Sequence, residues 1–119
     1  MFGRLRGTVR NLVIQNATSQ YTLSPNDSTK AESNYAAILA CTLSGTIENC
    51  KVVNSTVELS VTKSGAYETD HHALIAGGVV ARVYPEGRLD TVVCENTTVK
   101  VSNPSILGGG SNPYSPGWA

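Results

Sequence analysis

The segment of this 119-residue chain richest in side chains that bind metals is Glu68-Thr69-Asp70-His71-His72. Imidazole and carboxylate groups are ligands for zinc and other transition metals. A zinc site normally uses three or four ligands at defined spacing, whereas these side chains crowd into one loop without a distant partner. We therefore interpret the segment as a solvated loop, and we predict no metal and no cofactor.

Two further carboxylates, Asp90 and Glu95, have the chemistry of an acid–base pair. Enzymes that cleave polysaccharides place two carboxylates on either side of the scissile bond. Paired acids also occur by chance on solvated strands, and three stacked coils of chain would span only about 15 Å, too little for an extended sugar groove. We assign no catalytic residue and expect the protein not to be an enzyme. A fragment of a carbohydrate-active enzyme, similar to a polysaccharide lyase or hydrolase, is the alternative.

Four asparagines stand in sequons for N-glycosylation. Asn16, Asn54 and Asn96 each begin an Asn-x-Thr triplet, and Asn26 begins Asn-Asp-Ser. The first three fall at equivalent places in a repeated segment, so the repeat explains them without glycans. We interpret them as a ladder of stacked amides at a corner of the fold.

The three cysteines, Cys41, Cys50 and Cys94, do not form a C-x-x-C motif. An odd number without that spacing favours neither a disulfide framework nor a zinc site. We expect Cys50 and Cys94 to be buried and reduced, because free cysteine behaves as a small apolar residue. Their expected neighbours in the repeat are Leu12 and Val92 for Cys50, and Ile14 and Val52 for Cys94.

The elements that must position all these residues occur in three similar copies. They begin at Gly7, Gly45 and Gly87, and an asparagine falls nine residues after each glycine. The glycines are 38 and 42 residues apart, within the range typical of repeat architectures. Columns of equivalent residues include Arg10, Glu48 and Asp90, then Gln15, Val53 and Glu95, then Thr18, Thr56 and Thr98.

Each copy has the hydrophobic pattern of half-buried β-strands, in which apolar and polar residues alternate. The equivalent apolar positions are Val9, Leu12 and Ile14, then Ile47, Cys50 and Val52, then Leu89, Val92 and Cys94. The step from the first to the second position of each set breaks strict alternation. This break predicts a bulge or bend near Asn11, Asn49 and Thr91.

Further strands flank this segment in each copy. An alternating run follows each recurrent asparagine, clearest at Val57, Leu59 and Val61. Before each glycine, Met1–Leu5 aligns with Ile38–Thr42 and Val79–Val83. Each copy therefore reads as strand, glycine turn, strand, asparagine turn, strand and loop.

These patterns predict an all-β fold, a parallel and right-handed β-helix (solenoid) of about three coils with three short strands per coil. The coils would cover about residues 1–37, 38–78 and 79–110, with Val9, Ile47 and Leu89 in one inward column, followed by a Pro/Gly-rich tail at 111–119. The alternative is an antiparallel sandwich of nine short strands. The matching positions of glycine and asparagine argue against it.

Three segments, Phe2–Leu12, Leu43–Cys50 and Ala76–Val83, resemble the GLUG-type repeat. That repeat occurs in large secreted or surface proteins of bacteria, including relatives of gut Bacteroides, and in some IgA-protease-like surface proteins. The resemblance covers residues 1–110. It implies a β-helical stalk or adhesive module at the cell surface or outside the cell, and it carries no catalytic residues. The sequence departs from the repeat at Arg82–Glu86, where the link to Gly87 is two residues longer.

The composition excludes some classes of partner. Nine acidic and nine basic residues give a net charge of zero, so the chain has no electrostatic footprint for nucleic acid. No apolar run has the roughly 18–20 residues of a membrane span. The segment Met1–Arg6 lacks the apolar region of a signal peptide.

We therefore expect a structural or adhesive module of a bacterial cell-surface or secreted protein. Binding of glycans or host surface proteins is expected at the polar loops Ser24–Asn34 and Lys63–His72. Solenoids need protected ends because their outer strands have unpaired edges. We expect Pro113–Trp118 to cover one end. We expect the other end, Met1–Leu23, to be covered by another copy through end-to-end self-association, by further sequence of the parent protein, or by a neighbour in a crystal.

Overall fold

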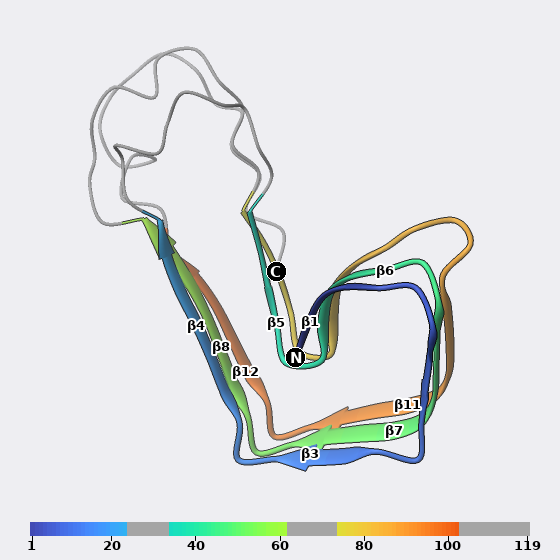
Figure 1. The fold of residues 1–119 in the computed structure, drawn as a ribbon. Coiled ribbons are helices and arrows are strands. Elements are labelled where there is room, and N and C mark those ends of the chain that lie inside the picture. Colours follow the sequence, from blue (N-terminus) through green and yellow to red (C-terminus); the bar gives the residue numbers. More distant parts are fainter. Residues whose placement is uncertain (24–33, 62–73, 103–119) are drawn as a thin grey trace.

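The computed structural model describes residues 1–23, 34–61 and 74–102 (Figure 1). In these ranges the chain forms β-strands joined by turns and bends, without helices. The strands are β1 (Phe2–Leu5), β2 (Thr8–Arg10), β3 (Val13–Gln15), β4 (Thr18–Leu23), β5 (Asn34–Ala37), β6 (Ala40–Leu43), β7 (Thr46–Val53), β8 (Thr56–Val61), β9 (Leu74–Gly77), β10 (Val80–Val83), β11 (Arg88–Glu95) and β12 (Thr98–Ser102).

All the strand pairs are parallel, as the pattern predicted, and they form four sheets. The sheets have the orders β1-β6-β10, β2/β3-β7-β11, β4-β8-β12 and β5-β9. In each of the first three, the central strand comes from the second copy of the sequence. Figure 1 shows this arrangement as blue, green and orange strands side by side. Equivalent strands of the three copies are therefore neighbours in space.

The register within the sheets follows the predicted columns. Val9 and Leu89 both pair with Ile47, and Ile14 and Cys94 both pair with Val52. The three glycines are also adjacent: the Thr46 N–H donates to the Gly7 carbonyl at 2.9 Å, and the Arg88 N–H donates to the Gly45 carbonyl at 2.9 Å. The prediction that these glycines lie beside one another is confirmed.

The bends predicted in the longer strands are also present. Asn11, Asn49 and Thr91 have φ angles of 56°, 49° and 52°, in the left-handed region. One left-handed residue shifts the alternation of the strand, so that Ile47 and Cys50, three residues apart, are both buried, at 0% and 4% exposed. Asparagine is one of the few residues that adopt this conformation readily.

A second set of left-handed residues forms the next corner. Asn16, Asn54 and Asn96 have φ angles of 56°, 50° and 46°. Each lies between a strand of the β2/β3-β7-β11 sheet and a strand of the β4-β8-β12 sheet. The recurrent asparagine therefore marks the turn between two sheets.

The expectation of three strands per copy is wrong, because β5 and β9 form a fourth sheet. The apolar run from Tyr35 to Leu43 contains a bend at Ile38 and Leu39 that divides it into β5 and β6. Both bend residues are only 2% exposed. A bend that is itself buried leaves no polar residue in the sequence to mark it.

The expected alignment of the first strand is also wrong by one residue in the second copy. It placed Phe2 beside Leu39, whereas the structure pairs Phe2 with Ala40. The alignment with Val80 was right, because Val80 also pairs with Ala40. Paired residues of β1 and β6 are thus 38 residues apart in the sequence, the same separation as Gly7 and Gly45.

The two extra residues before Gly87 form a β-turn. The Gly87 N–H donates to the Tyr84 carbonyl at 2.8 Å, and Pro85 occupies the second position, where its fixed φ suits such a turn. On one side of the turn, the Tyr84 N–H donates to the Leu43 carbonyl at 2.8 Å. On the other side the ladder resumes, since Arg88 pairs with Thr46. The insertion is confined to this corner.

The hydrophobic core lies against the central strands. Its largest fully buried side chains among the described residues are Leu39, Leu43, Ile47, Leu59, Val52 and Val57, all from the second copy. The exposed large apolar residues are Met1, Phe2, Leu12, Val13 and Tyr21 of the first copy, and Val83, Leu89 and Val93 of the third. A central strand has neighbours on both sides, whereas the outer strands have only one. The inward column of Val9, Ile47 and Leu89 is therefore fully covered only at Ile47.

The glycine at the central position gives a direct test of this packing. A Cβ atom at Gly45 would collide with the backbone carbonyl groups of Arg6 and Gly7, whereas one at Gly7 would meet no atom within 4 Å. We expect Gly45→Ala to lower the free energy of unfolding by about 3 kcal/mol, and Gly7→Ala to change it by less than about 0.5 kcal/mol. Urea denaturation measures both. Equal effects of the two substitutions would show that Gly45 does not pack against the backbone of Arg6 and Gly7.

Candidate functional site

Two arginines and two tyrosines from distant parts of the sequence gather beside sheet β1-β6-β10. Arg4 lies on β1, Arg82 on β10, Tyr35 on β5, and Tyr84 directly follows β10. Arg4 and Arg82 both pair with Thr42, so they share one face of the sheet, with Cα atoms about 10 Å apart. We call these four residues the arginine–tyrosine cluster.

Both guanidinium groups of the cluster contact the ring of Tyr84. The Cζ atoms of Arg4 and Arg82 lie 5.1 Å and 4.9 Å from the ring centroid, within the range of cation–π interactions. The Arg82 Nη1 also donates to the Tyr35 hydroxyl at 3.0 Å, and this hydrogen bond raises the pKa of Arg82. The Arg4 Nε donates to the Ser44 hydroxyl at 3.3 Å. Each arginine is thus held by one aromatic ring and one hydroxyl.

The two positive charges of the cluster have no acidic partner among the described residues. The ion pairs found there join Lys51 to Glu95, Arg88 to Asp90, and Lys100 to Glu58. Guanidinium groups bind carboxylate, sulfate or phosphate oxygens, often through two parallel hydrogen bonds. The arrangement is therefore chemically suited to an anionic group.

The sequence contains no motif for this cluster, because its members lie at positions 4, 35, 82 and 84. Two signals were present. Arg4 and Arg82 occupy equivalent positions in the first and third copies, and the sequence departs from its repeat in the segment from Arg82 to Glu86. The contribution of Tyr35 could not be anticipated, because it depends on the buried bend between β5 and β6.

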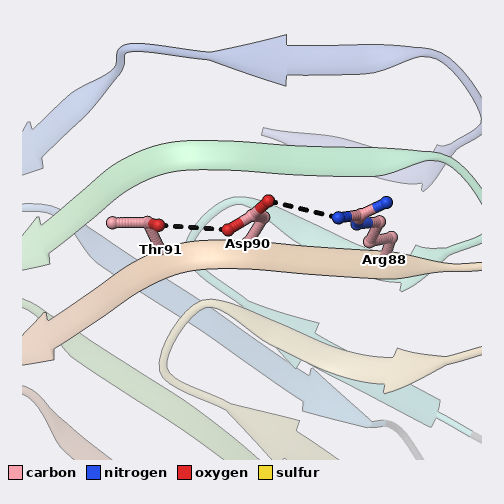
Figure 2. Close-up of polar contacts among 3 residues, drawn as sticks. All are labelled: Arg88, Asp90 and Thr91. Atoms are coloured by element: carbon pink, nitrogen blue, oxygen red, sulfur yellow. Dashed lines mark hydrogen bonds and ion pairs between the residues drawn. The ribbon is translucent and has the colours of Figure 1, made fainter.

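The candidate carboxylates Asp90 and Glu95 lie on β11 in the predicted columns, opposite Glu48 and Val53. Figure 2 shows Asp90 between Arg88, at 3.4 Å, and the Thr91 hydroxyl, at 3.1 Å. Glu95 forms an ion pair with Lys51 at 2.8 Å. A fully extended strand would place the two acids about 16 Å apart, and the left-handed bend at Thr91 lies between them. Catalytic carboxylate pairs of glycosidases lie about 5–9.5 Å apart and face a shared substrate. Here each acid instead forms an ion pair with a base.

The amide ladder lies at a different position from the one predicted. The Asn49 Nδ2 donates to the Asn11 Oδ1 at 2.8 Å, at the bend inside the strands. Among the described residues, no side-chain hydrogen bond joins the asparagines at the corner, Asn16, Asn54 and Asn96. These residues are explained instead by their positive φ angles. The turn is stabilised by the next residue, since the Ser55 hydroxyl donates to the Val53 carbonyl at 2.9 Å and accepts from the Ala17 N–H at 3.2 Å.

The cysteines have the predicted neighbours but not all the predicted burial. All three are free thiols. Cys50 pairs with Val92 and is buried, as expected, but Cys94 is exposed. Cys94 pairs with the buried Val52, yet it lies on β11, an outer strand of its sheet. Cys41 is half-buried, and desolvation raises the pKa of its thiol.

Several predicted sites lie outside the described residues. They are Glu68–His72, the second loop (Lys63–His72), the sequon at Asn26, all of the first loop except Asn34, and the tail at 111–119. Within 1–23, 34–61 and 74–102, no group of three or more His, Cys, Asp and Glu residues is placed to hold a metal ion.

No family model, curated protein or solved structure matches this chain. None of the described secondary structure is a helix of the length and apolarity needed to cross a bilayer.

The strained residue in Figure 2 provides a test of the bends. Thr91 has a φ of 52° where Asn11 and Asn49 stand in the other copies. A β-branched residue is costly in the left-handed region. We expect Thr91→Asn to raise the free energy of unfolding by about 1 kcal/mol. Thr98→Asn, at an exposed position of β12 without a positive φ, is the control. A gain with Thr98→Asn, or none with Thr91→Asn, would contradict this account.

The exposure of the cysteines predicts an order of reaction with maleimide. At pH 7.5 we expect Cys94 to react at least about tenfold faster than Cys50, because the latter is buried. Cys41 should also react slowly, since a raised pKa lowers the fraction of thiolate at this pH. Mass spectrometry of quenched samples measures each rate, with Cys94→Ser as the control that removes the fast phase. A fast reaction at Cys50 would show that this side chain is not buried in the protein.

Proposed function

We propose that the chain is a right-handed parallel β-solenoid of about three coils, and that it is a structural or adhesive module of a bacterial cell-surface or secreted protein rather than an enzyme. The observation that carries this proposal is the pairing of equivalent strands. In three separate sheets, strands of the second copy lie between their equivalents from the first and third.

The order and direction of the strands support the solenoid. The same copy order recurs in the sheets β1-β6-β10, β2/β3-β7-β11 and β4-β8-β12, and each pairing is parallel. Consecutive turns of one coiled path give this result without any reversal of direction. Crossovers between parallel strands of one sheet are almost always right-handed, which favours a right-handed coil.

The proposed location and role rest on the resemblance to the GLUG-type repeat in secreted and surface proteins of bacteria. A solenoid suits such a role because it displays side chains in regular rows along its length. Within the described strands, several outward rows are polar, including Thr18, Thr56 and Thr98, which lie side by side. We propose glycans or host surface proteins as ligands.

The alternative is a fragment of a carbohydrate-active enzyme. Asp90 and Glu95 would be its most suitable acids, since they lie on one strand and Glu95 is exposed while Asp90 is half-buried. Their ion pairs with Arg88 and Lys51 favour the non-catalytic role.

Binding and cleavage can be measured on the same purified chain. We expect a fluorescently labelled chain to be retained on an array of glycans and extracellular-matrix proteins. We also expect it to release no reducing ends and no unsaturated uronates from plant, animal or bacterial polysaccharides. Cleavage that is lost in Asp90→Asn or Glu95→Gln, but kept in Glu58→Gln, would establish the enzyme and overturn the proposal. Retention on no glycan and no protein would exclude the adhesive role.

A further inference from the structure

We propose that the arginine–tyrosine cluster binds the carboxylate or sulfate group of an acidic polysaccharide. This inference rests on the proposed adhesive function and assigns it a site and a class of ligand. The site lies beside sheet β1-β6-β10, and all four of its residues are among those that the structure describes.

The charge of this column distinguishes it from the other outward columns. In the described sheets, the column of Arg4, Thr42 and Arg82 is the one that holds two like charges and no acid. The other charged columns hold either a single charge or charges of both signs: Glu58, for example, accepts from Lys100 at 3.3 Å. An acid at the central position would neutralise the arginines, but Thr42 is neutral and its hydroxyl donates to the Gly3 carbonyl at 3.3 Å. Within the described part of the chain, no residue of this column supplies an anion to the two charges.

The geometry of the two guanidinium groups places both within reach of one polysaccharide chain. Because each Cζ lies about 5 Å from the same ring centroid, the two Cζ atoms are at most about 10 Å apart. A guanidinium has five N–H donors. The hydrogen bonds to Tyr35 and Ser44 use one N–H of each arginine, which leaves the others for a ligand. A carboxylate or sulfate has several acceptor oxygens, so it can accept two parallel hydrogen bonds from a guanidinium group.

The cluster is also partly preorganised. Arg82 is held by the Tyr35 hydroxyl and the Tyr84 ring, and the β-turn that begins at Tyr84 fixes that ring beside the sheet. Groups held in place before binding lose less conformational freedom when the ligand arrives. This favours a defined binding site over two independent surface charges.

A polysaccharide is the carrier of the anion that fits the proposed adhesive function. The ring of Tyr84 already contacts both guanidinium groups and the Tyr35 hydroxyl accepts from Arg82, so the contacts to the anion come from the arginines. Nucleic acid fits less well, because it presents a dense row of phosphates. Its binding depends on many basic residues, and this chain has a net charge of zero. We therefore expect a polysaccharide with sparse acidic groups.

Isothermal titration calorimetry of the full chain tests this assignment. The probes are polygalacturonate for carboxylate, dextran sulfate for sulfate, neutral dextran, and duplex DNA.

The variant Arg4→Gln/Arg82→Gln removes both charges of the cluster. The control Arg10→Gln/Arg88→Gln removes the same charge from the β2/β3-β7-β11 sheet. We expect the first variant to weaken binding of an acidic polysaccharide at least about tenfold and the control by less than about twofold. Circular dichroism checks that each variant is folded. If the Arg4→Gln/Arg82→Gln variant does not fold, Arg82→Lys is used in its place, because it keeps the charge but loses the planar fork.

Each result has a distinct meaning. Preference for polygalacturonate identifies carboxylate, and preference for dextran sulfate identifies sulfate. Equal loss in both double variants, preference for neutral dextran or DNA, or no binding of either acidic probe would overturn the inference. The adhesive function would then still be judged by the array of glycans and proteins. Cleavage of a probe would instead overturn the proposed function, even if the cluster binds the sugar.

Discussion

The hydrogen-bonded ladder between equivalent strands is the interaction on which the rest of the structure depends. Strands as short as β2 and β3, with three residues each, have too few contacts to be stable alone. The eight-residue β7 gives both of them a partner on one side and pairs with β11 on the other. The apolar residues of the second copy form the core because their backbone is paired on both edges.

The ladder requires that every copy bend at the same places, and left-handed residues meet this requirement. Asn11, Asn49 and Thr91 bend the strands at one position in the register. The amide bond between Asn49 and Asn11 then joins two copies at the bend. Thr91 lacks that amide, but its hydroxyl bonds to Asp90 instead (Figure 2). All three copies thus have the left-handed backbone at this position, whereas the side-chain hydrogen bonds made there differ between the copies.

The same stacking decides which charges are satisfied. Columns of equivalent residues bring side chains from three copies to neighbouring positions, so acids and bases that alternate between copies neutralise one another. Glu58 shows this, since it accepts from Gln20 of the first copy and Lys100 of the third. At Arg4 and Arg82 the copies supply the same charge, and the ring of Tyr84 partly offsets it. Among the described residues, this column is thus the one in which two charges of the same sign meet without an acid.

The sequence by itself determined the parallel pairing, the register of the long strands and the positions of their bends. Glycine and asparagine recur at fixed places because few other residues fit those backbone positions, so the pattern is local and readable. Only the tertiary structure decided the bend at Ile38 and Leu39, the exposure of Cys94 and the approach of Tyr35 to Arg82. These features depend on which segment lies beside which. Apolar residues look alike in sequence whether they bend inside a core or continue a strand, and whether a neighbouring strand covers them.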